Sequence, residues 1–256
     1  MLPWSRLTAP LLYLRVRYGN LASLIRRRED LARRWLTGSG IEVGALHKPL
    51  PVPADVRVSY VDRMSTAELQ AHYPELSGMP LAPVDRVDNG ERLETFADGS
   101  QSFIIGNHLL EHCEDPIGML SAWIRVLRPG GIAYLAVPDK RFTFDSRRLP
   151  TDWFHFLADR HDGGIASRSA HYHEWAETVE GLTGKAAAAR VQTLLAARYS
   201  IHFHVWTTTT LVAFLERCSH ELNLGFALCD RVRNGVETLV ILQKRSVDQD
   251  GPGAPP

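Results

Sequence analysis

The sequence predicts an α/β protein built on a doubly wound, mostly parallel sheet that ends in an antiparallel hairpin. The stretch with the clearest signals, residues 102–140, alternates strand, helix and strand, as a βαβ unit of about thirty or more residues does. Short apolar runs before and after it raise the expected number of strands to seven. The 29 basic and 29 acidic residues balance, so the net charge gives no indication of a nucleic-acid partner.

The first 37 residues differ from the rest because leucines and isoleucines are interleaved with arginines. This pattern predicts one or two basic amphipathic helices with a break near Gly19 and Asn20. We expect this segment to lie across the domain with a solvated arginine face. Peripheral attachment to an anionic membrane surface or to a partner is the alternative, since basic amphipathic helices do both.

A single domain is expected over residues 38–245, followed by a Gly/Pro-rich disordered tail over 246–256. No apolar stretch reaches the roughly 20 residues that span a bilayer. Cys113, Cys218 and Cys229 are odd in number and lack metal-binding spacing. These observations predict a soluble cytoplasmic protein with no disulfide framework.

The first half of the sheet is expected to contain three strands. The first ends at Val43, the second covers Val56–Tyr60, and the third covers Val84–Val87 after a helix within 65–76. Three prolines, at positions 49, 51 and 53, forbid a regular helix directly after the first strand. We therefore expect an irregular first crossover.

The second half of the sheet has clearer signals for the start and end of each element. The apolar strand Ser102–Gly106 ends in Asn107 and His108, where a parallel strand delivers side chains to a ligand. Asp115 and Pro116 begin a helix, as N-cap and first helical residue, and 129–131, Pro-Gly-Gly, ends it before the strand 132–137. Two further strands, 224–232 and 236–243, are joined through Asn-Gly, a strong hairpin signal.

The segment DGSQSFIIGNHLLEHCEDPIGMLSAWIRVLRPGGIAYLAVPD resembles the region from the fourth to the fifth strand of the class I S-adenosylmethionine-dependent methyltransferases. That family combines a hydrophobic strand, a His-x-Leu-Glu-His loop, an acidic-Pro helix start, a Leu-x-Pro-Gly-Gly turn and a strand that ends in Pro. The resemblance extends over about 42–244. It implies the Rossmann-like methyltransferase fold, seven strands with a C-terminal antiparallel hairpin, and S-adenosyl-L-methionine as cofactor.

By this resemblance, the cofactor would lie along the carboxyl ends of the first four strands. Of the family's glycine loop the sequence keeps Glu42 and Gly44, while Leu46 and Lys48 stand in place of the other two glycines. Asp62, about twenty residues on, has the spacing of a carboxylate that accepts ribose hydroxyls. The expected cofactor contacts are Glu42, Gly44, Ala45, Asp62, Arg63, Asp88, Asn89, Asn107 and His108.

Residues 140–206 are too many for an ordinary connection and predict a cap inserted after the fifth strand. Two His-x-His pairs, 171/173 and 202/204, would each place both rings on one side of an extended segment. They suit a general base, a metal site or plain polar packing. Our candidates for the base are His171, His173 and Asp139, and we expect no metal.

The predicted function is an S-adenosylmethionine-dependent methyltransferase that modifies an oxygen, or less readily a nitrogen, of a polar small molecule or glycan. Two alternatives stay open at this point. The missing glycines allow a non-catalytic scaffold that has lost its cofactor, and a related sheet would serve a nicotinamide-dependent oxidoreductase, which the absent GxGxxG disfavours. The sequence does not specify the oligomeric state.

Overall fold

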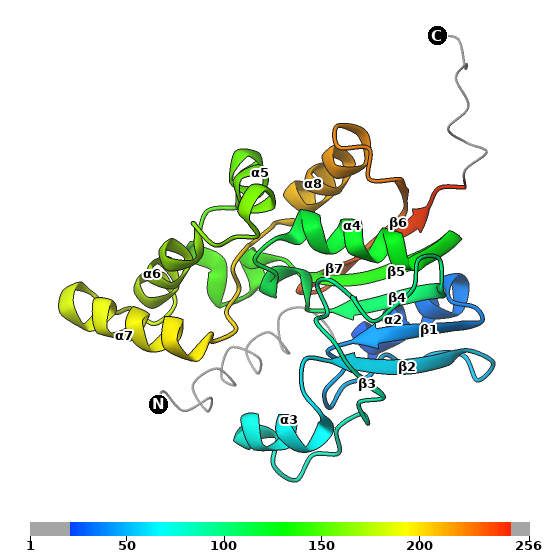
Figure 1. Cartoon of the computed structure of the whole chain (residues 1–256), viewed down its shortest axis with the longest axis horizontal. Coiled ribbons are helices and arrows are strands. Elements are labelled where there is room, and N and C mark those ends of the chain that lie inside the picture. The colour runs from blue at the N-terminus through cyan, green and yellow to red at the C-terminus, as the bar shows by residue number, and fades with distance from the viewer. Residues whose placement is uncertain (1–20, 247–256) are drawn as a thin grey trace.

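The computed structural model describes residues 21–246, and its centre is one seven-stranded sheet (Figure 1). The strands lie in the order β3-β2-β1-β4-β5-β7-β6. The first five are parallel, and β7 is antiparallel to both β5 and β6. The prediction of a mostly parallel sheet that ends in an antiparallel hairpin is confirmed. The strands are β1 (Ser39–Val43), β2 (Arg57–Asp62), β3 (Arg86–Val87), β4 (Gln101–Asn107), β5 (Leu127–Pro138), β6 (Phe226–Asn234) and β7 (Glu237–Lys244).

Seven α-helices and four short 3₁₀ helices belong to the described part of the chain. The α-helices are α2 (Leu21–Trp35), α3 (Thr66–His72), α4 (Pro116–Val126), α5 (Trp153–Asp162), α6 (Arg168–Thr178), α7 (Gly184–Ala197) and α8 (Thr208–His220). The 3₁₀ helices are η2 (Pro74–Leu76), η3 (Leu110–His112), η4 (Lys140–Phe142) and η5 (Phe144–Arg147). The described stretch between β1 and β2 contains no helix, as its prolines require.

Helices cover both faces of the sheet, which explains the continuous apolar strands. Phe103 and Ile105 of β4 pack with residues of α2, whereas Ile104 between them packs with α4 and α8. This alternation follows from the two-residue period of a strand. All three side chains are fully buried, and each contributes about 2 kcal/mol of hydrophobic stabilisation.

The expected helix starts are present in the structure. Asp115 is the N-cap of α4, its Oδ1 accepts a hydrogen bond from the Gly118 N–H at 2.7 Å, and Pro116 occupies the first helical position. Thr207 caps α8 through a capping box with Thr210. These local signals fix the residues at which α4 and α8 begin.

Helix α2 is the described part of the basic N-terminal segment, whose first 20 residues lie outside the described residues. Its apolar residues Leu31 and Ala32 are buried against the sheet. Arg28 and Arg34 pair with Glu237 and Asp230 of the C-terminal hairpin. Part of the arginine face therefore contacts protein. No described helix has the length and apolar character needed to cross a membrane.

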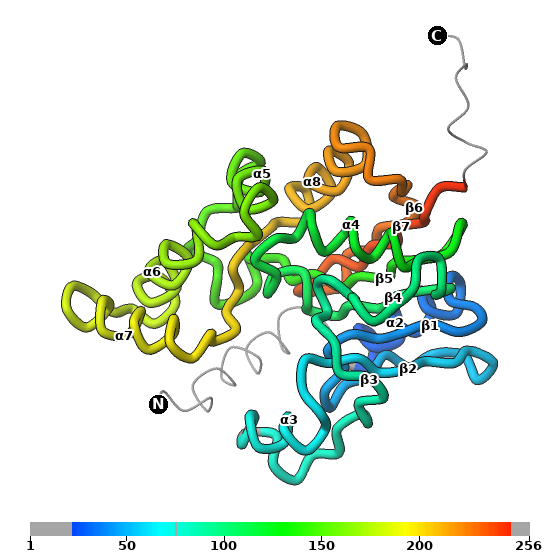
Figure 2. The backbone as a smooth tube through the Cα atoms, in the orientation of Figure 1, coloured from blue at the N-terminus to red at the C-terminus, as the bar shows by residue number. Residues whose placement is uncertain are grey.

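Residues 140–206 form a cap beyond the carboxyl ends of the parallel strands, where α6 and α7 extend away from the sheet (Figure 1). The cap has a small core of its own, in which Tyr172, Val191 and Phe203 are buried. Its last segment runs back beside the chain that follows β4 (Figure 2), and the Phe203 N–H donates to the Glu111 carbonyl at 2.8 Å. The cap is thus bonded to the edge where the strands end.

One expectation for the cap is wrong. His171 and His173 lie in α6, not in an extended segment, and residues two apart on a helix point in different directions. His171 is accordingly buried and His173 is exposed. His202 and His204 do lie in extended chain, and both are buried.

Candidate active site

The candidate site lies where β1 and β4 end side by side. From β1 the sheet order runs outward through β2 and β3 on one side, and from β4 through β5 on the other. A crevice at such a switch point is the general ligand site of open parallel sheets. Glu42 and Asn107, at the ends of the two strands, are joined by a hydrogen bond from Asn107 Nδ2 to Glu42 Oε1 at 3.1 Å.

Glu42 shapes the loop that follows β1. Its side chain is buried, and both of its oxygens accept the Leu50 N–H at 3.0 Å. Burial raises the pKa of Glu42 to about 7, although the hydrogen bonds from Leu50 and Asn107 oppose this. The buried carboxyl group therefore holds the end of the loop over 44–50 in place through hydrogen bonds with protein groups.

The same loop keeps the backbone shape of a glycine turn at a position without glycine. Gly44 has φ 70° and Leu46 has φ 47°. A left-handed conformation costs a non-glycine residue about 1 kcal/mol or more. The Leu46 carbonyl accepts the Ala82 N–H at 2.7 Å, which helps to hold this conformation. Ala45, between the two, is half-buried.

Asp62 lies beside this loop at the end of β2. The Gly44 N–H donates to the Val61 carbonyl at 2.9 Å, and this hydrogen bond holds Gly44 close to Asp62. Asp62 Oδ1 accepts the Arg63 N–H at 2.7 Å, and partial burial raises the pKa of Asp62. The Arg63 guanidinium turns toward the end of α3, where it contacts His72 and Tyr73 at 3.2 Å.

Asp88 and Asn89 follow β3 and organise their own loop. The Asp88 N–H donates to the Asp62 carbonyl, and Asp88 Oδ2 accepts both the N–H and the hydroxyl of Thr95. Although burial opposes it, these bonds lower the pKa of Asp88. Asn89 Oδ1 accepts the Glu91 N–H at 2.9 Å. Both predicted residues thus lie at the expected edge, with their oxygens engaged in the loop.

His108 turns the other way, toward β7. Its Nε2 lies 2.6 Å from Glu237 Oε2, and its Nδ1 lies 3.6 Å from Glu111 Oε1. The residue has φ 55°, and two-fifths of its side chain is exposed. Burial lowers the pKa of His108, but the hydrogen bond with Glu237 and the charge of Glu111 outweigh burial, and the net shift is upward. His108 is therefore a partly exposed imidazole held between two carboxylates.

The two carboxylates were not among the predicted site residues. Glu237 is buried but is held by Arg28 and Asn234 as well as by His108, and despite burial these partners lower its pKa to about 2. Glu111 is buried with both oxygens lacking a hydrogen-bond partner among the described residues, and burial raises its pKa. Glu111 belongs to the His-x-Leu-Glu-His motif, which could have revealed it.

The three predicted base residues do not form one group. Asp139 follows β5, where its oxygens accept from the Arg141 guanidinium at 2.9 and 2.6 Å and from the Thr208 N–H at 3.1 Å. His171 Nε2 lies 3.0 Å from His155 Nε2 inside the cap, and His173 is exposed. Within residues 21–246, no hydrogen bond or ion pair joins Asp139 to either histidine.

The residues at the ends of β1, β2 and β4 fit S-adenosylmethionine, the cofactor that the resemblance implies. Asn107 Oδ1 is buried and has no hydrogen-bond partner in the described chain, so it can accept from an ammonium group. Asp62 offers a carboxylate to the ribose hydroxyls, and the half-buried Gly44 loop lies beside it. We assign Asn107, Asp62 and Gly44 as the residues that would hold the cofactor.

Comparison with known proteins gives the family. A family model described as a methyltransferase domain matches residues 19–183, more than half of the chain. No curated protein matches the sequence. Among solved structures, the chain is similar to a SAM-dependent methyltransferase from Aquifex aeolicus, with 13% identity, a TM-score of 0.43, and coverage of 82% of this chain and 83% of that chain.

Two further solved structures are similar at the same level. One is a SAM-dependent methyltransferase from Methanosarcina mazei, with 18% identity, a TM-score of 0.44 and coverage of 83% and 95% of the two chains. The other is an O-methyltransferase family protein from Burkholderia thailandensis, with 16% identity, a TM-score of 0.44 and coverage of 95% and 58%. The match of the family model is what decides the assignment, against both the scaffold and the oxidoreductase. The chain belongs to the methyltransferase domain family and is an enzyme that uses S-adenosylmethionine as its methyl donor.

Proposed function

We propose that this enzyme methylates a hydroxyl oxygen of a polar small molecule or glycan, and that His108 is the general base. The observation that carries the proposal is the place of His108, directly after Asn107 at the end of β4, with Glu237 on one ring nitrogen. A nitrogen acceptor is the weaker candidate, because an amine needs no base as firmly held as this one.

The geometry assigns a role to each nitrogen of His108. Glu237 is an acceptor when ionised, so the Nε2–H of a neutral imidazole donates to it and the lone pair is left on Nδ1. Glu237 then orients the ring and stabilises the imidazolium that forms when Nδ1 takes a proton. The bound cofactor supplies a methyl carbon already activated by the positive sulfur. The protein has to align the acceptor hydroxyl and remove its proton.

Glu111 supports a hydroxyl-rich acceptor. Among residues 21–246 its two buried oxygens have no hydrogen-bond partner, and they lie 3.6 Å from His108 Nδ1 and 4.0 Å from His202 Nε2 at the closest. A buried carboxylate left unpartnered costs several kcal/mol, so an acceptor that donates two hydroxyl hydrogens there would gain affinity. Vicinal hydroxyls of a sugar or a related polyol have this chemistry.

The contacts favour His108 over the three residues expected from the sequence. The carboxylate of Asp139 is occupied by Arg141 and by the start of α8. His171 is buried among other cap side chains, and the side chain of His173 is exposed to solvent. None of the three combines a partly exposed side chain with a position directly after Asn107, which we propose to hold the cofactor.

Calorimetric titration with S-adenosylhomocysteine, followed by turnover on a panel of sugars, polyols and phenols, tests the proposal. We expect Asp62→Ala to weaken the binding of S-adenosylhomocysteine at least tenfold. We expect His108→Gln to lower kcat by a factor of 10² to 10⁴ with binding unchanged, and His173→Ala, an exposed cap control, to retain turnover. Unchanged turnover in His108→Gln would remove the base, and turnover only on amines would remove the oxygen acceptor.

The pH profile gives an independent test. Glu237 helps to raise the pKa of His108, so the base stays protonated to a higher pH than a free imidazole would. Glu237→Gln should therefore shift the acidic limb of kcat to lower pH. A limb that stays in place would mean that another group takes the proton.

A further inference from the structure

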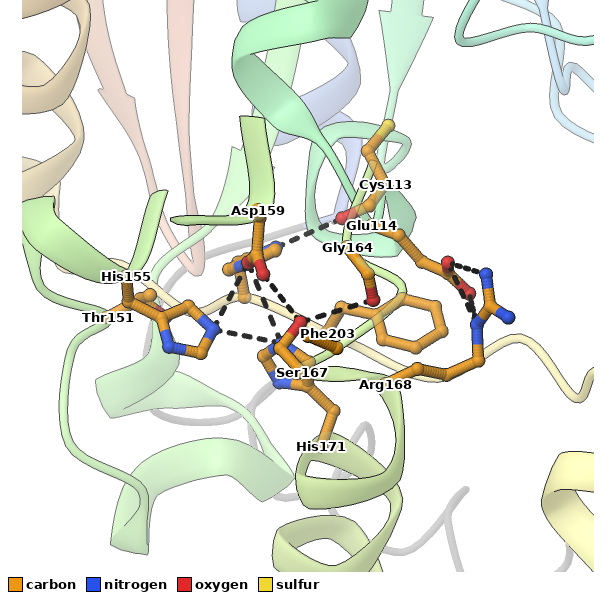
Figure 3. Close-up of polar contacts among 12 residues, drawn as sticks. Cys113, Glu114, Thr151, His155, Asp159, Gly164, Ser167, Arg168, His171 and Phe203 are labelled. Carbon is orange, nitrogen blue, oxygen red and sulfur yellow. Dashed lines mark hydrogen bonds and ion pairs between the residues drawn. The ribbon is translucent and has the colours of Figure 1, made fainter. Parts of the chain in front are cut away.

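We infer that the cap contains a metal site, formed by His155, Asp159, His171 and His204, which binds one Zn²⁺ ion per chain. This inference goes beyond methyl transfer and is independent of the acceptor. The four residues come from three separate segments: α5 supplies the first two, α6 supplies His171, and the extended chain before α8 supplies His204. Figure 3 shows His155, Asp159 and His171 pointing toward a common centre.

The four donor atoms are close enough to share one ion. Nε2 of His155 lies 3.0 Å from Nε2 of His171 and 3.1 Å from Asp159 Oδ2. Asp159 Oδ2 lies 2.8 Å from His204 Nε2 and 3.8 Å from His171 Nε2, and all four atoms lie within 4.8 Å of one another. A tetrahedral zinc ion with bonds of 2.0–2.1 Å holds its ligands about 3.3 Å apart, which is near the middle of these distances.

The hydrogen bonds around His204 fix which of its nitrogens faces the centre. His204 Nδ1 lies 3.0 Å from the Cys113 carbonyl oxygen, which can only accept, so Nδ1 carries the hydrogen. In the neutral ring, Nε2 then has a lone pair that faces the carboxylate of Asp159 at 2.8 Å. A hydrogen or a metal ion must therefore lie between these two atoms, and the nearby Nε2 atoms of His155 and His171 favour a metal ion.

Groups behind the ligands hold them in place, as they do in known metal sites. Ser167 donates to Asp159 Oδ1 at 2.5 Å, which leaves Oδ2 for the centre. His155 and Asp159 are four residues apart on α5 and therefore lie on one face of that helix. The rings of Phe156 and Phe203 pack against His204 and His171 and exclude water from one side.

Ligand chemistry selects the ion. Three imidazole nitrogens and one carboxylate oxygen suit Zn²⁺ and not Mg²⁺ or Ca²⁺, which prefer oxygen ligands. Four protein ligands leave no open position in a tetrahedral site, which is typical of a structural zinc. His155, with about a third of its side chain exposed, provides the path by which the ion enters. The ion would tie α5, α6 and the returning chain together.

The test measures metal binding on the purified full chain, so that its failure is separate from any failure of the methyl-transfer proposal. The protein is stripped with a chelator and reconstituted with Zn²⁺ or Co²⁺, and the metal content is measured by mass spectrometry. We expect one ion per chain, visible absorption typical of four-coordinate Co²⁺, and a Tm that rises when Zn²⁺ is added. A folded wild-type chain that takes up neither ion would overturn the inference.

Variants locate the site. We expect His155→Ala and His171→Ala to weaken Zn²⁺ binding at least a hundredfold in competition with a chromogenic chelator. His173→Ala, two residues away on the exposed side of α6, should bind within twofold of the wild type. Circular dichroism checks folding, and His155 gives the test if His171→Ala does not fold, because its side chain is partly exposed. Full binding in the His155 variant would refute the assignment.

A second control separates a neighbouring group. Glu111, His112 and His202 also bring one ligand atom each within 4.8 Å of the others. Because we place the ion among the four cap residues and not in this second group, His202→Ala should leave Zn²⁺ binding unchanged. Loss of binding in His202→Ala, with His155→Ala unaffected, would move the ion to that group and contradict the site proposed in the cap.

Discussion

The buried carboxyl group of Glu42 should make the stability of this enzyme fall as pH rises through neutrality. Burial raises the pKa of Glu42 from its ordinary value of 4.5 to about 7. The folded state therefore binds this proton more tightly than the unfolded chain does. The resulting stabilisation is fully present below pH 4.5 and is lost as pH rises through the folded pKa near 7.

The size of the effect follows from the shift. Each pKa unit corresponds to about 1.4 kcal/mol, and the part lost between pH 5 and pH 8 amounts to about 2 to 3 kcal/mol. In Glu42→Gln this ionisation is absent. The Gln oxygen can still accept the Leu50 N–H, and an amide flip of Asn107 would let its unpartnered Oδ1 accept the new N–H group.

The assay is urea unfolding of wild type and Glu42→Gln at several pH values between 5 and 8. The free energy of unfolding of the variant, minus that of the wild type, should increase by about 2 to 3 kcal/mol over this range, whatever fixed cost the substitution has at pH 5. Glu216→Gln, an exposed position on α8, controls for the loss of a negative charge. A Glu42→Gln difference that stays constant within about 0.5 kcal/mol would refute the reasoning.

Three further comparisons of variants test local features of the structure by urea unfolding at pH 7. Because Leu46 has φ 47°, Leu46→Gly should be about 1 kcal/mol more stable than Leu46→Ala, and the reverse order would show that the turn is unstrained. Thr207→Ala removes the capping box of α8 and should lower the free energy of unfolding by about 1 kcal/mol. No loss would mean that packing alone holds the start of the helix. Arg148→Met leaves the buried carboxylate of Asp145 without its cation and should lower the free energy of unfolding by about 3 to 5 kcal/mol. Adding Asp145→Asn should restore part of this loss. A loss below about 1 kcal/mol would contradict a buried ion pair between the two residues.

The fold could be predicted because its signals are local. Asp115 and Pro116 mark a helix start that needs no tertiary contact, and the Asn234–Gly235 pair marks the hairpin in the same way. The alanine-rich composition of Gly184–Ala197 favours a helix, and this segment forms α7. Helix α6 was missed because its histidines, tryptophan and threonine have no strong helix propensity, and the helix is held by the core of the cap.

The site could be predicted only in part because its pairings are long-range. The positions of Asp62 and Asn107 follow from spacing and strand ends, and the structure places both at the predicted edge. The partner of His108, Glu237, is 129 residues away and becomes visible only with the register of β7. Asp159 likewise has no motif of its own, although it is the carboxylate on which three cap histidines converge.

A single loop, between β4 and α4, connects the cofactor side of the site to the cap. Asn107 bonds to Glu42 on one side, while the Cys113 carbonyl accepts from His204 on the other. Between them, the left-handed His108 is held by Glu237 although this conformation costs energy. Since Cys113 is fully buried and its carbonyl binds a cap residue, the cap cannot shift without moving the loop that carries His108. We therefore expect the position of the cap to set the position of His108, the base that we propose.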